Sequence, residues 1–141
     1  MKFKDEHAEQ AALFSWADFT RGRYPELAML FAIPNGGHRH KAVAVRMKAE
    51  GVKPGVPDIC LPVPRGPWHG LYIEMKTEAG SVSREQPHWL ALLSRQGYLA
   101  EVCRGWQQAQ AVIEDYLTTA ADVGRQRMDE LNPARGDACH G

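Results

Sequence analysis

The chain has 141 residues, which is enough for one domain with a sizeable hydrophobic core. Its 17 basic and 17 acidic residues cancel, so any binding of nucleic acid requires locally grouped basic residues or a metal ion. The sequence shows neither a membrane-spanning apolar run nor a signal-peptide core, and its three widely spaced cysteines argue against a disulfide framework or a zinc site. We therefore expect a cytoplasmic protein with no membrane partner.

The first predicted element is a helix over residues 5–21. Its apolar side repeats at intervals of three and four residues, through Gln10, Leu13, Phe14 and Ala17. Glu6 and Glu9 are three residues apart and therefore lie on one flank of this helix. Acidic residues commonly stabilise the first turn of a helix, but either glutamate could also supply a carboxylate to a site. The pattern leaves both interpretations open.

A buried strand and a glycine turn are predicted next. The apolar run 27–33 favours a strand that is buried on both faces. Asn35, Gly36 and Gly37 then break the chain before a basic helix, which is expected to end at Gly51. The buried side of this helix is not defined by a clear apolar stripe.

The glycine turn and the start of the basic helix form a candidate phosphate site. Such a turn can hold a phosphate through free backbone N–H groups and the positive end of the helix dipole. The candidate contacts to a DNA backbone are Asn35, Gly36, Gly37, Arg39 and Lys41. An ordinary turn followed by a solvent-exposed helix would give the same pattern. A nearby metal site would make the DNA interpretation the better one.

Two short strands carry the residues with the greatest chemical content. They are predicted over residues 58–61 and 71–76, and the Pro-Arg-Gly-Pro segment between them favours a hairpin. Side chains alternate along a strand, so Glu74 and Lys76 emerge on one face, close to Asp58 of the neighbouring strand. A lone Glu-x-Lys is usually a solvated face, but its combination with Asp58 indicates a site. Two carboxylates suit a hard cation such as Mg²⁺, and an amine beside them can steady a water or a developing negative charge.

The remaining chain is predicted to contain a helix from Ser83, a strand over residues 98–103 and a final helix. Ser83 and Gln86 match the capping-box pattern, which explains Gln86 without any chemistry. We expect a single domain over residues 1–118, followed by an irregular, flexible tail over residues 119–141.

Several motifs occur in the order that is typical of one nuclease family. They are Glu6-x-x-Glu9-Gln10, Ile33-Pro34-Asn35-Gly36-Gly37, Glu50-Gly51-Val52, Gly55-Val56-Pro57-Asp58, Ile73-Glu74-Met75-Lys76, Ser83-x-x-Gln86-x-x-Trp89-Leu90 and Gly97-Tyr98. From about Glu6 to Leu117 the sequence resembles the virus-type replication-repair nuclease (VRR-NUC) family, a branch of the PD-(D/E)XK nucleases. The resemblance implies an α/β fold with a restriction-endonuclease-like core, in which helices flank a mixed β-sheet.

The resemblance also implies metal-dependent hydrolysis of phosphodiester bonds. The metal is expected to be Mg²⁺, with Mn²⁺ as a substitute. The implied ligands are Asp58, Glu74, the backbone carbonyl of Met75, and either Glu6 or Glu9. Lys76 would orient or help to deprotonate the attacking water and stabilise the charge that develops on the phosphate, and Gln86 is implied to lie near the active site.

DNA is the substrate that the resemblance implies, with branched molecules such as four-way junctions as expected targets and a homodimer as the expected form. One alternative is a DNA-binding module that keeps the fold without the activity. A His-Asn-His metallonuclease is disfavoured, because the sequence has neither a histidine-rich hairpin nor paired Cys-x-x-Cys motifs. A structural protein whose charges are merely solvated is a third alternative.

Overall fold

The computed structural model describes residues 5–34, 40–80 and 85–120. Its helices are α1 (Glu6–Phe19), the 3₁₀ helix η1 (Pro25–Met29), α2 (Lys41–Ala49), α3 (Glu85–Arg95) and α4 (Trp106–Thr118). Its strands are β1 (Phe31–Ala32), β2 (Ile59–Leu61), β3 (Leu71–Lys76) and β4 (Leu99–Arg104). The expected tail lies outside the described residues from position 121 onward, so the domain boundary at residue 118 stays a prediction.

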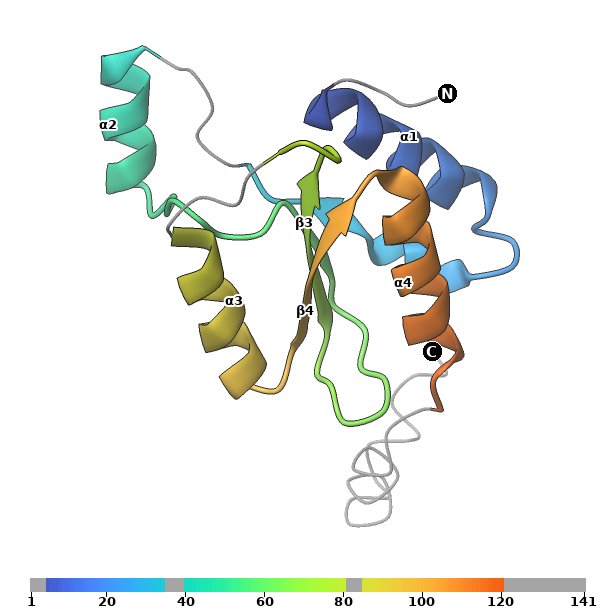
Figure 1. The fold of residues 1–141 in the computed structure, drawn as a ribbon. Coiled ribbons are helices and arrows are strands. Elements are labelled where there is room, and N and C mark those ends of the chain that lie inside the picture. Colours follow the sequence, from blue (N-terminus) through green and yellow to red (C-terminus); the bar gives the residue numbers. More distant parts are fainter. Residues whose placement is uncertain (1–4, 35–39, 81–84, 121–141) are drawn as a thin grey trace, which may run out of the picture.

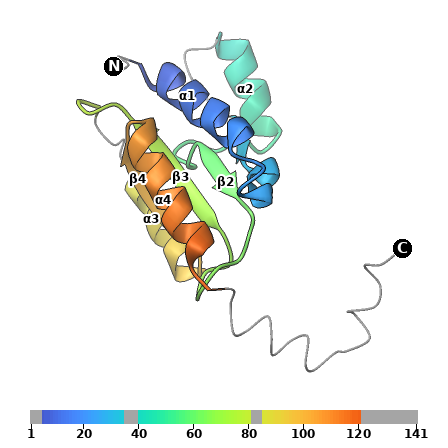
Figure 2. The same cartoon turned by 90° about the vertical axis from the view of Figure 1, so that its right-hand side faces the viewer.

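The four strands form one mixed sheet in the order β1-β2-β3-β4. The pairs β1–β2 and β2–β3 are antiparallel, and β3 and β4 are parallel. Helices α1 and α4 lie on one face of the sheet, and α3 lies on the other (Figures 1 and 2). A mixed sheet between layers of helices confirms the predicted fold class.

The main hydrophobic core lies between the sheet and the helices α1 and α4. Alternation along β3 directs Leu71, Ile73 and Met75 to this side, where none is more than 1% exposed. Leu13 of α1 and Ile113 of α4 pack in the same cluster and are fully buried. Glu74 and Lys76 alternate with this apolar set along β3 and carry the candidate site at the end of the strand, where Lys76 meets Glu6 of α1.

The strand predicted over residues 27–33 is wrong. These residues form the end of η1 and then β1, which has only two residues. Pro25 at the start of η1 favours a helical turn, because its ring fixes φ near the helical value. Met29 and Phe31 are 51% and 47% exposed. The segment is therefore a short edge of the sheet and is not buried on both faces.

The other predicted helices and strands are confirmed over the described residues, with small shifts at their ends, while the predicted helix start at Ser83 lies outside those residues. Helix α1 begins after Asp5, whose side chain accepts a hydrogen bond from the Ala8 N–H at 2.6 Å. Helix α2 ends before Gly51, whose φ of +95° is accessible to glycine without strain. No residue of α2 is buried, and this helix projects from the body of the molecule (Figure 1). None of the described helices is long and apolar enough to cross a membrane.

Candidate active site

A tight turn places Asp58 at the beginning of β2. Gly55 in this turn has a φ of +84°, a conformation that side chains with a Cβ rarely adopt. Oδ2 of Asp58 accepts a hydrogen bond from the backbone N–H of Met75 at 2.8 Å. The next residue, Ile59, pairs with Ile73 across the antiparallel β2–β3 ladder. The carboxylate of Asp58 therefore lies against the end of β3 that carries Glu74 and Lys76.

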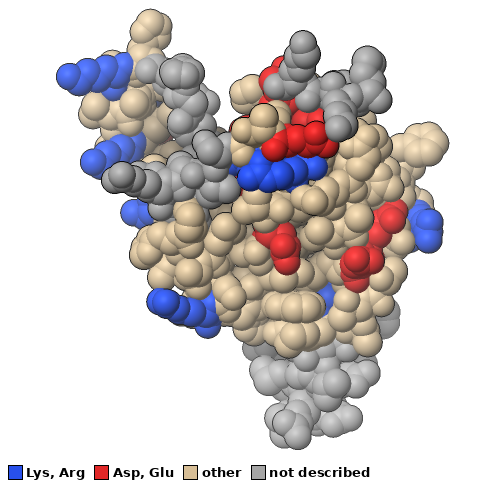
Figure 3. Space-filling model, in the orientation of Figure 1, with Lys and Arg blue, Asp and Glu red and all other residues tan. Residues whose placement is uncertain are grey.

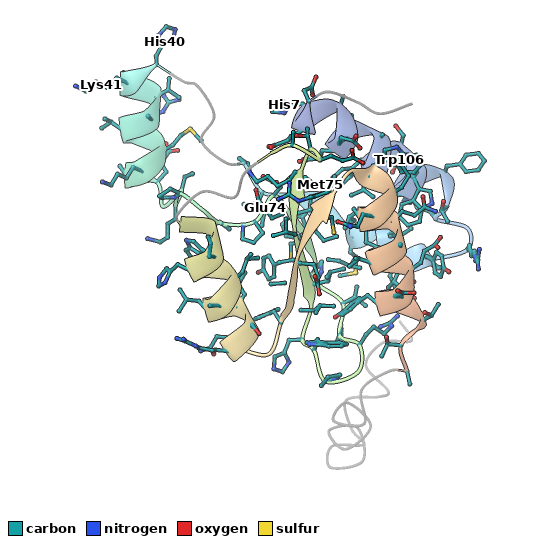
Figure 4. All side chains as sticks on the ribbon, in the orientation of Figure 1. His7, His40, Lys41, Glu74, Met75 and Trp106 are labelled. Atoms are coloured by element: carbon teal, nitrogen blue, oxygen red, sulfur yellow. The ribbon has the colours of Figure 1, made fainter. Side chains whose placement is uncertain are left out.

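Glu74 and Lys76 emerge together from β3, as their spacing predicts. The Lys76 Nζ lies 3.6 Å from the Glu74 Oε1. The two residues are only 2% and 8% exposed, so they do not form a solvated face. Figure 4 shows Glu74 and Met75 in the middle of the molecule, among the helices α1, α3 and α4. The strand thus holds two ionisable side chains in contact in the interior, where such residues are rare unless they are paired.

The electrostatic environment of Glu74 is strongly perturbed. Burial raises the pKa of its carboxyl from the ordinary value of 4.5 to about 8, and the nearby charge of Asp58 acts in the same direction. Lys76 lowers the pKa of Glu74, but it does not offset these effects. Without a bound cation, Glu74 therefore keeps a proton at neutral pH. A cation held by both carboxylates would displace that proton.

The donor set fits a magnesium ion. Carboxylate oxygens are the hard ligands that Mg²⁺ prefers, and Mg²⁺ is commonly held by one or two of them together with waters and substrate phosphates. Within the described part of the chain, no group of three or more histidine, cysteine, aspartate or glutamate side chains could hold a metal ion. A site built from Asp58 and Glu74 therefore has the composition of a magnesium site and not that of a zinc site.

The two glutamates of α1 contact different partners. The Glu6 Oε1 lies 3.7 Å from the Lys76 Nζ. Glu9 is 5% exposed, and its Oε2 accepts a hydrogen bond from the backbone N–H of Trp106 at 2.6 Å. Gly105, the N-cap of α4, has no side chain to satisfy that N–H, so Glu9 does so from another helix. Glu6 thus joins the Lys76 end of the site, whereas Glu9 connects α1 to α4.

The other predicted site residues are not brought into this group. Lys41 is exposed at the start of α2, far from the labelled Glu74 and Met75 (Figure 4). The positions outside the described residues are Asn35, Gly36, Gly37 and Arg39. Gln86 belongs to the first turn of α3, but its side chain is not described. Its place near the site therefore stays a prediction.

Arg104 is a residue near the site that the sequence does not single out. It ends β4 and lies beside Lys76 in the parallel register. Its Nη1 donates hydrogen bonds to the backbone carbonyls of Thr77, at 3.0 Å, and of Gly80, so it shapes the turn that follows Lys76. Only the pairing of β3 with β4 brings these groups together, and no local motif signals that pairing.

Comparisons with known proteins agree with this geometry. The family model described as the VRR-NUC domain matches residues 2–107, a span that includes Asp58, Glu74 and Lys76. A solved structure titled "VRR_NUC domain protein" is similar with a TM-score of 0.74 and 26% sequence identity, over 88% of this chain and 97% of that chain. No curated protein matches the sequence. With a match over most of its length and a fold shared with a structure of the same description, the chain belongs to the VRR-NUC domain family, which is a nuclease-related family.

Proposed function

We propose that this protein is a metal-dependent DNA endonuclease. The observation that supports the proposal most directly is the placement of Asp58 against β3, next to a buried pair of Glu74 and Lys76. Burying Glu74 and Lys76 beside the half-buried Asp58 costs stability, and a carboxyl with a strongly raised pKa, such as that of Glu74, is typical of a functional site. A cation and a negatively charged phosphate are the ligands that this set of charges would accept.

In this proposal Asp58, Glu74 and the backbone carbonyl of Met75 hold Mg²⁺, for which Mn²⁺ can substitute. The metal, when bound, lowers the pKa of a water and neutralises charge on the phosphate. Lys76 orients the attacking water and stabilises the negative charge that develops on the phosphate. Glu6, 3.7 Å from the Lys76 ammonium, holds this ammonium in position.

The proposed substrate is DNA, and branched DNA in particular. Helix α2 carries Lys41, Arg46 and Lys48, all of them exposed. On the face shown in Figure 3, the charged side chains along the left edge, over α2 and α3, are lysine and arginine, while the centre and the right carry acidic side chains with basic ones among them. A chain with no net charge thus presents one basic side to a DNA backbone. The glycine turn at 35–37 and Arg39 are proposed to contact the same backbone.

A homodimer is proposed as the acting form on four-way junctions. A two-fold axis would place two identical sites on two DNA strands. Analytical ultracentrifugation of the protein, alone and with a four-way junction, measures this directly. Sedimentation as a monomer in both conditions would rule the dimer out.

The activity is tested by comparing cleavage of a linear duplex, a flap and a four-way junction, with Mg²⁺ or with EDTA. Cleavage is expected only with the metal, and Lys76→Ala should lower turnover by at least about a hundredfold, a typical loss for a group that stabilises transition-state charge. The matched control is Arg23→Ala, which removes an exposed positive charge beyond the far end of α1. Wild-type turnover by Lys76→Ala would refute the role of Lys76. Binding of DNA without cleavage of any substrate would show instead an inactive DNA-binding module of the same fold.

A further inference from the structure

A pocket of about 340 Å³ lies beside the turn that leads into Asp58. Its apolar walls come from Ile33, Pro34, Val52, Val56 and Trp89. The backbone N–H of Ile33 donates a hydrogen bond to the backbone carbonyl of Asp58 at 2.7 Å. Val56 precedes Asp58 by two residues, a span of at most about 7 Å along the chain. The pocket and the carboxylate site are therefore immediate neighbours.

Trp89 gives this pocket an aromatic wall. It is half-buried in α3, and its indole N–H makes no hydrogen bond with another residue of the described chain. A flat aromatic wall favours a flat ligand, and every nucleobase has a π-face that can stack on such a ring. The N–H at the edge of the ring can also donate to a ring nitrogen or carbonyl of a base.

One basic residue and one acidic residue line the rim of the pocket. Lys53 lines it, and no other described residue forms an ion pair with its ammonium. Glu50, the acidic residue of the lining, lies 3.8 Å from the guanidinium of Arg46, which balances its charge. An aromatic surface beside a cationic side chain such as that of Lys53 is the combination by which proteins bind unpaired nucleotides, with stacking for the base and positive charge for the phosphates. A purely apolar partner would gain nothing from Lys53.

We propose that this pocket binds one unpaired nucleobase of the DNA next to the phosphodiester that is cut, with the Trp89 ring as the stacking surface and Lys53 beside a neighbouring phosphate. The inference rests on the proposed nuclease function and specifies its substrate. A paired base would first have to be unstacked and unpaired, whereas a base at a flap, bulge or junction is already free to enter. The pocket would thereby select DNA that has unpaired nucleotides at the cutting position.

The test is a binding experiment in EDTA, where DNA remains uncut. Two duplexes of the same sequence carry the fluorescent base 2-aminopurine, paired in one and bulged in the other. The wild type is expected to bind the bulged duplex more tightly than the paired one and to change the fluorescence of the bulged 2-aminopurine. Trp89→Ala should weaken binding of the bulged duplex by about 5- to 150-fold, the range for loss of one base–aromatic stack, and leave binding of the paired duplex nearly unchanged. Phe19→Ala, which removes an aromatic side chain that is 92% exposed, is the control and should change neither affinity.

Three outcomes would overturn the proposal. The first is equal binding of the two duplexes by the wild type, and the second is equal weakening of both by Trp89→Ala. The third is that Trp89→Ala converts a wild-type dimer into a monomer and keeps the preference for the bulged duplex. The last outcome would show that a second copy of the chain occupies the pocket. If Trp89→Ala does not fold, Val52→Asp, which places a negative charge on another residue of the pocket lining, replaces it with the same expectation. Absence of a bulge preference in the wild type, with Mg²⁺-dependent cleavage present, would refute the pocket alone, and a bulge preference without cleavage of any substrate would refute the nuclease alone.

Discussion

Replacing Glu74 by glutamine is predicted to stabilise the metal-free protein while abolishing cleavage. The pKa of Glu74 in the folded chain is about 8, raised from 4.5 chiefly by burial. Between these two values the folded state binds one more proton than the unfolded state, so the free energy of unfolding falls as the pH rises. This stabilising contribution is fully present below the unfolded-state pKa of 4.5. It is lost as the pH rises through the folded-state pKa of about 8. One proton gives a slope of about 1.4 kcal/mol per pH unit, so about 3 kcal/mol is lost by neutral pH.

Glutamine has nearly the shape of a protonated glutamate and requires no proton uptake. At neutral pH the unfolding free energy of Glu74→Gln should therefore be about 1–3 kcal/mol higher than that of the wild type. The lower end of this range allows for the weaker contact that glutamine makes with Lys76. The difference should nearly vanish at about pH 5 and be largest at about pH 8. Urea denaturation in EDTA at a series of pH values measures it.

Glu101→Gln is the matched control, because Glu101 is a half-exposed glutamate on the neighbouring strand, opposite Ile73 in the register. Mg²⁺ should stabilise the wild type and not Glu74→Gln, since only the wild type can exchange the proton for the cation. A difference between Glu74→Gln and the wild type that stays constant with pH would refute the reasoning. The reasoning would also be refuted if the difference between Glu101→Gln and the wild type showed the same dependence on pH.

Two further substitutions test the ligand set and the support of α1. Asp58→Asn keeps an oxygen that can accept the hydrogen bond from the Met75 N–H but removes the negative charge. Calorimetry should show an affinity for Mg²⁺ that is at least about tenfold lower, because the loss of even an indirect contact to a metal costs that much. An unchanged affinity would remove Asp58 from the ligand set. Glu9→Ala leaves the part-buried N–H of Trp106 without its acceptor and should lower the unfolding free energy by about 1–2 kcal/mol. Glu9→Gln, which retains an oxygen, should lose less, and equal losses in urea denaturation would contradict the capping role.

The central part of the site could be predicted because it depends on local rules. Side-chain alternation alone puts Glu74 and Lys76 on one face of β3. The segment between β2 and β3 is short, so the two strands pair as neighbours and bring Asp58 to Met75. Neither step requires knowledge of how distant parts of the chain pack.

The parts that could not be predicted depend on such packing. The spacing along α1 places Glu6 and Glu9 on the same flank of the helix. Only the docking of α1 beside α4 brings Glu6 to Lys76 and Glu9 to Trp106. In the same way, the apolar composition of residues 27–33 favours a buried strand. It cannot show that the segment lies at the edge of the sheet, where two residues are enough to pair with β2.

The docking of α1 also explains how Glu9, which is hydrogen-bonded to the backbone of α4, can affect the geometry around Lys76. Glu9 holds the first N–H of α4 through Trp106, and the preceding residue, Gly105, donates its own N–H to the Lys76 carbonyl at 3.0 Å. One turn away on α1, Glu6 lies beside the ammonium of that same lysine. The backbone and the side chain of Lys76 are therefore fixed from two directions by one helix. A shift of α1 would move both contacts at once, and because electrostatic stabilisation depends on preorganised geometry, the position of Lys76 depends on Glu9 as well as on Glu6.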